Sequence, residues 1–163
     1  MKSNSINEDS SYNFENSLDD TFIEFKIDNV NCLDIVGDTT KLIDLISSNV
    51  LVYYYSDLHC SSCYENQLRI IQKYFYELEQ KVVVLGSYLS YRYFKVYINN
   101  NDYSLPIYYV DYGDLDSLLT DYHTPLFFTL NSELEASNFY IFNEESFNYN
   151  EEYFRKVKRL LSN

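Results

Sequence analysis

The feature that most constrains this chain is an apolar run, Val50 to Tyr55, that precedes two closely spaced cysteines. A continuous apolar run of this length predicts a strand covered on both faces, as in the centre of a parallel sheet. Residues 56–59 interrupt the run. From Cys60 onward the pattern predicts a helix, because apolar residues recur at helical spacing at Leu68, Ile71, Phe75 and Leu78. The motif Cys60-Ser61-Ser62-Cys63 therefore opens a helix that follows a buried strand.

The rest of the chain predicts further strands and helices around this unit. We expect strands at Thr21–Asp28, Cys32–Val36, Val82–Leu85, Pro106–Asp111, Leu126–Leu130 and Phe139–Phe142. We expect helices at Thr39–Ser47, Ser90–Asn99, Asp114–Tyr122 and Asn150–Leu161. Alternation that ends in an antiparallel hairpin predicts an α/β sandwich with a mixed sheet. Residues 1–20, rich in Ser, Asn, Asp and Glu, predict a flexible or disordered polar tail ahead of one domain, residues 21–163.

The charge balance limits the partners of this chain. It has 25 acidic residues against 12 lysines and arginines, a formal net charge of -13, which disfavours nucleic acid and anionic membrane surfaces. An acidic face that selects basic partners is the alternative to a merely solvated surface. No stretch approaches the ~20 apolar residues of a membrane helix, so we expect no membrane insertion of this segment. Residues 1–20 also lack the apolar core of a secretory signal.

The three cysteines, Cys32, Cys60 and Cys63, are too few for a secreted disulfide framework and odd in number. This count fits one working pair and one spare thiol. Because Cys32 lies in an apolar strand away from the motif, we expect it to be buried and inert.

The motif has the elements that disulfide exchange requires. The attacking species is the thiolate, and a free cysteine titrates near ~8.5. A sulfur at a helix N-terminus faces unpaired backbone N–H groups, which favour the anion, and Cys63 lies one helical turn further on. Ser61 and Ser62 can cap the helix or hydrogen-bond to sulfur. His59 could stabilise the thiolate if protonated, relay protons if neutral, or have no role.

Two other interpretations of a Cys-x-x-Cys motif stay open. It can be half of a structural zinc site, but such sites usually take four ligands. The other candidate ligands are only Cys32, His59 and His123, with no second Cys-x-x-Cys. The cysteines could also form a structural disulfide without turnover. The position after a buried strand and before a long helix favours redox chemistry, so we predict neither a metal nor a cofactor.

Two segments carry a resemblance to a known family. VLVYYYSDLHCSSCYENQL resembles the strand, active-site loop and first helix of the thioredoxin superfamily, and DYHTPLFF resembles the loop and strand that carry its cis-proline. The chain is most similar to the TlpA/ResA-like bacterial envelope thiol–disulfide oxidoreductases, over roughly residues 30–162. The resemblance implies a three-layer sandwich around a central mixed sheet, with an N-terminal extension and a mid-fold insertion. It also favours the cell envelope, periplasmic or lipid-anchored, over the cytoplasm.

The resemblance assigns roles to four residues. It implies that Cys60 is the more exposed nucleophile and Cys63 the resolving thiol. It further implies that Pro125 is cis and that Thr124 presents its backbone to a bound substrate. Since proline donates no ladder hydrogen bond, Pro125 would leave a polar edge free for an incoming peptide.

The chain departs from the family pattern at three places. His59 replaces the usual tryptophan before the first cysteine, and serine replaces the proline between the cysteines. Tyr54 occupies the position of a buried acid, which puts the reduction potential and the proton relay in doubt. Asp57 or Glu65 could accept the proton instead.

These features together predict a thiol–disulfide oxidoreductase that works in the reducing direction. Its partners would be protein disulfides and a redox donor protein, and the chain would be a monomer. One alternative is a non-catalytic binding module on the same fold. A peroxiredoxin-like thiol peroxidase is less favoured, because the upstream Thr and Pro and the nearby Arg that it needs are missing before Cys60.

Overall fold

The computed structural model describes residues 25–115, 124–142 and 147–162. The predicted polar tail, residues 1–20, and most of the predicted helix Asp114–Tyr122 lie outside these ranges. No helix in the described part of the chain is long and apolar enough to cross a membrane.

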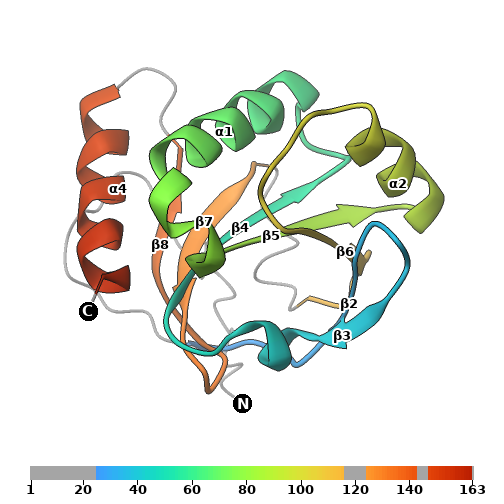
Figure 1. Cartoon of the computed structure of the whole chain (residues 1–163), viewed down its shortest axis with the longest axis horizontal. Coiled ribbons are helices and arrows are strands. Elements are labelled where there is room, and N and C mark those ends of the chain that lie inside the picture. Colours follow the sequence, from blue (N-terminus) through green and yellow to red (C-terminus); the bar gives the residue numbers. More distant parts are fainter. Residues whose placement is uncertain (1–24, 116–123, 143–146, 163) are drawn as a thin grey trace, which may run out of the picture.

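The described residues build one mixed sheet with the strand order β1-β8-β7-β4-β5-β6-β2-β3 (Figure 1). Its strands are β1 (Phe25–Lys26), β2 (Asn31–Leu33), β3 (Thr39–Lys41), β4 (Val50–Ser56), β5 (Val82–Tyr88), β6 (Ile107–Asp111), β7 (Leu126–Leu130) and β8 (Glu135–Ile141). β4 runs parallel to β5 and antiparallel to β7. Every residue of β4 is buried, which confirms a central strand covered on both faces.

Among the described residues, three α-helices pack on one face of this sheet (Figure 1). They are α1 (Ser61–Tyr74), α2 (Tyr91–Asn99) and α4 (Phe147–Leu161). α1 connects β4 to β5 and α2 connects β5 to β6, as parallel neighbours require. The apolar stripes of the helices bury Leu68, Ile71, Phe94, Phe154 and Val157 against Leu51, Tyr53 and Tyr55. α2 and β6 lie in the middle of the chain, where the resemblance implies an insertion.

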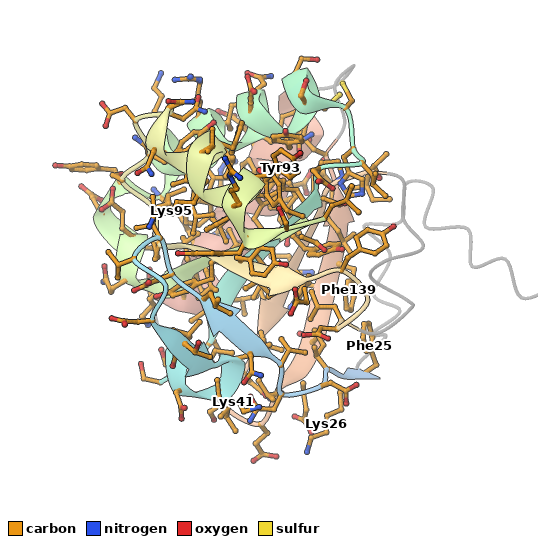
Figure 2. The ribbon with its side chains drawn as sticks, turned by 90° about the vertical axis from the view of Figure 1, so that its right-hand side faces the viewer. Phe25, Lys26, Lys41, Tyr93, Lys95 and Phe139 are labelled. Atoms are coloured by element: carbon orange, nitrogen blue, oxygen red, sulfur yellow. The ribbon has the colours of Figure 1, made fainter. Side chains whose placement is uncertain are left out.

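A thinner layer covers the opposite face of the sheet. There a 3-10 helix, η1 (Leu42–Leu45), and the segment 27–30 pack on Val52, Tyr54, Val83 and Phe128. The N-terminal residues also frame the sheet: β1 pairs with β8 at one edge, and the β2–β3 hairpin forms the other. Phe25 of β1 stacks on Phe139 of β8 with ring centroids 5.0 Å apart (Figure 2).

The predicted helix Thr39–Ser47 is wrong in its first part. The chain forms the strand β3 and then η1, because Thr40 pairs with Cys32 across a hairpin. Asp34 closes the turn by accepting three backbone N–H groups through Oδ1, all at 2.9 Å. Gly37 has a φ of 102°, a left-handed conformation that glycine tolerates without strain. Pairing with β2 thus overrides the local helical spacing.

Candidate functional site

The loop between β4 and α1 places Cys60 at the carboxyl end of the central strand. The N–H of Asp57 still donates to the Ser87 carbonyl of β5 at 2.9 Å, and the N–H of His59 turns back to the Ser56 carbonyl at 3.0 Å. Cys60 is the N-cap residue of α1, and its carbonyl accepts the N–H of Cys63 at 3.1 Å. The first sulfur therefore lies at the helix N-terminus, as the sequence predicts.

The surroundings of Cys60 favour its thiolate. Its side chain is exposed and that of Cys63 is half-buried, and the two sulfurs are not joined in a disulfide. The pKa of Cys60 is lowered, chiefly by a hydrogen bond from the Cys63 thiol and then by the Ser62 hydroxyl, whose Oγ lies 3.2 Å from Sγ. The backbone N–H groups of Cys63 and Ser62 lower it further. Ser62 thus contacts sulfur, whereas Ser61 is simply exposed.

His59 is buried under the loop. It is 8% exposed, and its Nδ1 accepts the backbone N–H of Ser56 at 3.1 Å. The ring stands edge-on to Tyr54 with centroids 6.3 Å apart. This hydrogen bond and the contact with Tyr54 hold the ring of His59 in place beneath the loop.

The carboxylate of Asp57 lies in the loop beside the motif and links it to β5. Asp57 accepts the N–H of Leu89 through Oδ2 at 3.2 Å, which ties the β4 loop to the end of β5. Asp57 Oδ1 is buried and has no hydrogen-bond partner among the described residues. An unpaired buried acceptor is costly unless a proton or water reaches it. Of the two acids considered as proton acceptors, Asp57 thus has a free buried oxygen.

Tyrosines anchor the motif helix to the central strand. Tyr64, directly after Cys63, stacks on Tyr55 of β4 with centroids 4.7 Å apart. Tyr53 of β4 donates its hydroxyl to Gln67 Oε1 at 3.1 Å. Gln67 is a polar residue of α1, but it is buried. Its spacing of three from Tyr64 was the available signal.

Thr124 and Pro125 lie at the same edge of the sheet as the motif loop. Leu126, the next residue, pairs with Tyr54 near the end of β4. Thr124 is exposed and Pro125 is buried. No peptide bond between described residues is cis, so the predicted cis-proline at Pro125 is wrong. A trans bond is intrinsically favoured by ~0.5–1 kcal/mol at proline, and β7 begins only after this residue, so its missing N–H costs no ladder bond.

Comparison with known proteins identifies the architecture. BsSco, a member of the Sco family of cytochrome c oxidase assembly proteins, matches 87% of this chain and 94% of its own with a TM-score of 0.61 at 10% identity. The exposed lipoprotein thioredoxin of Streptococcus pneumoniae matches 81% of this chain and 96% of its own, with a TM-score of 0.54 at 18% identity. The chain has a thioredoxin-like fold.

A third solved structure has the same thioredoxin-like fold. The reduced 2-Cys peroxiredoxin of Plasmodium vivax matches 86% of this chain and 97% of its own, with a TM-score of 0.53 at 13% identity. No model of a known protein family matches the sequence, and no curated protein does. These three solved structures therefore share their fold with this chain.

The third cysteine is remote from the surface of the thioredoxin-like fold. Cys32 is fully buried in β2, and burial raises the pKa of its thiol to about 12 although the charge of Lys41 opposes this. A protonated, inaccessible thiol is unreactive. Within residues 25–115, 124–142 and 147–162, no three His, Cys, Asp or Glu side chains are grouped to hold a metal ion.

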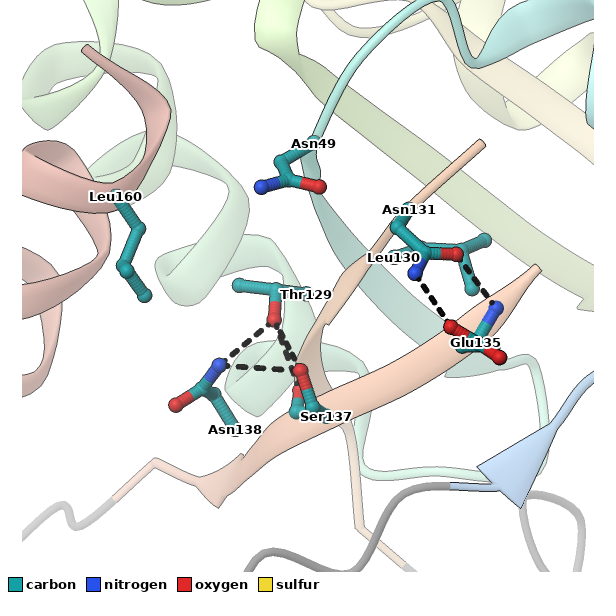
Figure 3. Close-up of a pocket in the computed structure, with 8 residues that line it drawn as sticks. All are labelled: Asn49, Thr129, Leu130, Asn131, Glu135, Ser137, Asn138 and Leu160. Carbon is teal, nitrogen blue, oxygen red and sulfur yellow. Dashed lines mark hydrogen bonds between the residues drawn. The ribbon is translucent and has the colours of Figure 1, made fainter. Parts of the chain in front are cut away.

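A polar depression of about 200 Å³ lies at the opposite end of the sheet (Figure 3). Thr129, Ser137 and Asn138 line it and bond to one another, with Asn138 Nδ2 2.9 Å from Thr129 Oγ1. Since Thr129 pairs with Leu51 at the start of β4, most of the strand separates this depression from Cys60.

Proposed function

We propose that this chain is a thiol–disulfide oxidoreductase in which Cys60 attacks a protein disulfide and Cys63 resolves the mixed disulfide. One observation carries the proposal: an exposed Cys60 sulfur at the head of α1 has a lowered pKa and lies beside a half-buried second thiol. A thiolate that is both accessible and stabilised is the nucleophile that disulfide exchange needs. The thioredoxin-like fold supports the same chemistry.

Two substitutions at sulfur make up the reaction. The Cys60 thiolate attacks one sulfur of the substrate disulfide, an S–S bond forms between them, and the other substrate sulfur leaves as a thiolate and takes up a proton. Cys63 then loses its proton and attacks Cys60 Sγ, which releases the second substrate thiolate. The substrate gains two electrons, and the protein is left with a Cys60–Cys63 disulfide.

Each turnover then requires a dithiol donor to reduce Cys60–Cys63 again. We place this chain in the reducing direction, because serines rather than a histidine separate its cysteines. The proton of Cys63 needs an acceptor, and Asp57 with its unpaired buried Oδ1 is our candidate. Thr124, exposed at the edge beside the motif loop, would present backbone to the bound substrate.

Insulin reduction with a recycling dithiol donor tests the proposal. The wild type should turn over, and Cys60→Ser should abolish turnover. Cys63→Ser should accumulate a mixed disulfide that mass spectrometry detects, since the first attack still occurs without resolution. Cys32→Ala is the matched control, because this thiol is fully buried and its loss should leave the rate unchanged.

An inert wild type would overturn the proposal and favour the alternative of a binding module that keeps the fold without turnover. A wild type whose two motif thiols resist alkylation when reduced would do the same. Turnover that survives Cys60→Ser would show that the motif is not the reacting centre.

A further inference from the structure

Exposed apolar side chains lie at the same edge of the sheet as the exposed thiol, at the carboxyl ends of the parallel strands. We define the redox face as Leu58, Cys60, Leu89 and Tyr112, each of which follows one of β4, β5 and β6. Leu58 is 63% exposed, Leu89 70% and Tyr112 49%. Because the three strands are parallel neighbours, the segments that follow them share one edge. Large exposed apolar side chains that gather around a reactive group indicate a contact surface.

Carboxylates frame this redox face. Asp111 and Asp114 are both exposed and lie on either side of Tyr112 in one turn, with the Asp114 N–H 3.2 Å from the Asp111 carbonyl. Asp111 accepts the hydroxyl of Tyr109. The pKa of Tyr109 is raised by burial, then by this hydrogen bond and by the charges of Asp111, Asp114 and Asp57. The charges of all three acids therefore reach the hydroxyl of Tyr109, although Asp57 belongs to the motif loop and the other two lie at the end of β6.

Basic residues are scarce at the same edge. Residues 57–60, 89–90 and 112–115 contain no lysine or arginine. On α2, Arg92 and Lys95 are exposed, and Figure 2 shows Lys95 and Tyr93 on the outer side of this helix. The formal charges in these three segments, Asp57 and Asp114, and that of the adjoining Asp111 are all negative, as is the net charge of -13 for the whole chain.

We propose that the redox face docks an extended polypeptide segment whose disulfide is flanked by basic residues. This inference rests on the proposed oxidoreductase function and names the substrate class. Leu58, Leu89 and Tyr112 would cover the disulfide and the methylene groups of lysine or arginine, whose charged ends reach Asp111 and Asp114. The same carboxylates repel a disulfide flanked by acidic residues before it reaches the Cys60 thiolate, so they discriminate against it.

Three cyclic peptides with one disulfide and identical apolar residues test this selectivity in the full-length chain. They differ only in two flanking positions, which are Lys, Gln or Glu. At low ionic strength we expect kcat/KM to fall in the order Lys, Gln, Glu, with roughly a tenfold range from first to last. The range should shrink toward unity at about 1 M salt, where the screening length is about 3 Å.

A pair of double variants assigns the effect to the redox face. Asp111→Asn with Asp114→Asn should reduce the Lys-to-Glu ratio at least about threefold. Asp44→Asn with Glu133→Gln removes the same formal charge from η1 and the β7–β8 turn, and should keep the ratio. Both control residues are exposed. Asp44 precedes β4 and Glu133 follows β7, so both lie at the end of the sheet opposite Cys60.

The outcomes separate the two proposals. If the wild type reduces all three peptides at equal rates, or if the control variant loses selectivity as much as the Asp111/Asp114 variant, the docking inference fails and the oxidoreductase stands. If the wild type reduces neither the Gln peptide nor insulin, the proposed function itself fails.

Discussion

The buried tyrosines make this protein lose stability at alkaline pH. Five of them are at most 3% exposed and have a raised pKa: Tyr53, Tyr54, Tyr55, Tyr88 and Tyr153. In each, burial is the main cause. Their pKa in the unfolded chain is about 10. Because the folded chain keeps these protons while the unfolded chain releases them, their contribution to stability is complete below about pH 10 and is lost as pH rises toward the folded pKa values.

The magnitude follows from this difference. At about pH 11, each such tyrosine costs the folded state about 1.4 kcal/mol relative to neutral pH. For Tyr54, burial raises the pKa to about 12. The contribution of this residue to stability is therefore mostly lost once the pH reaches about 12. The five together cost about 7 kcal/mol at about pH 11, against a total stability of roughly 5–15 kcal/mol for a typical domain. We therefore expect the chain to unfold between about pH 10 and 12.

Urea unfolding at a series of pH values, followed by far-ultraviolet circular dichroism in a reducing buffer, measures this loss. Phenolate absorbance on the same samples shows whether tyrosine ionisation coincides with unfolding. Tyr54→Phe removes one titrating group and should gain about 1.4 kcal/mol over the wild type between neutral pH and about pH 11. Tyr76, which is 73% exposed, supplies the control: Tyr76→Phe should leave the pH dependence unchanged.

A free energy of unfolding that stays level up to about pH 11 would refute this reasoning. So would a Tyr54→Phe variant with the same pH dependence as the wild type, because the loss would then come from other groups.

Three further predictions concern the motif and its support. Tyr53→Phe should lower the free energy of unfolding by about 1–3 kcal/mol, because the buried Gln67 Oε1 loses its donor; equal urea midpoints would contradict this. Gly86→Ala should cost about 1–3 kcal/mol in thermal unfolding, since its Cβ would lie 3.0 Å from a tyrosine hydroxyl; an unchanged melting temperature would show that the rings yield freely. Ser62→Ala should raise the pKa of Cys60, read from the pH dependence of alkylation, because its hydroxyl no longer bonds the sulfur; an identical profile would exclude that role.

Local patterns were enough to predict the centre of the site. The apolar run Val50–Tyr55 and the helical spacing after Cys60 record burial directly, because side chains on a covered strand and on one helix face are apolar for local geometric reasons. Local patterns also predicted the antiparallel hairpin of β7 and β8 and a helix that opens at the motif. The thioredoxin-like fold and the exposure of Cys60 were implied by the resemblance of two segments to the thioredoxin superfamily.

Contacts between distant segments decided the rest. The β2–β3 hairpin replaced a predicted helix because Thr40 found a partner in Cys32, and Gln67 became buried because a tyrosine of β4 reached it. The Thr124-Pro125 motif alone predicted a cis peptide bond at Pro125, whereas the bond is trans. Asp111 and Asp114 lie about fifty residues beyond Cys60 in the chain. Only the parallel pairing of β4, β5 and β6 brings their segment to the edge where the thiol lies, because side chains far apart in sequence meet through hydrogen-bonded strands and not through local periodicity.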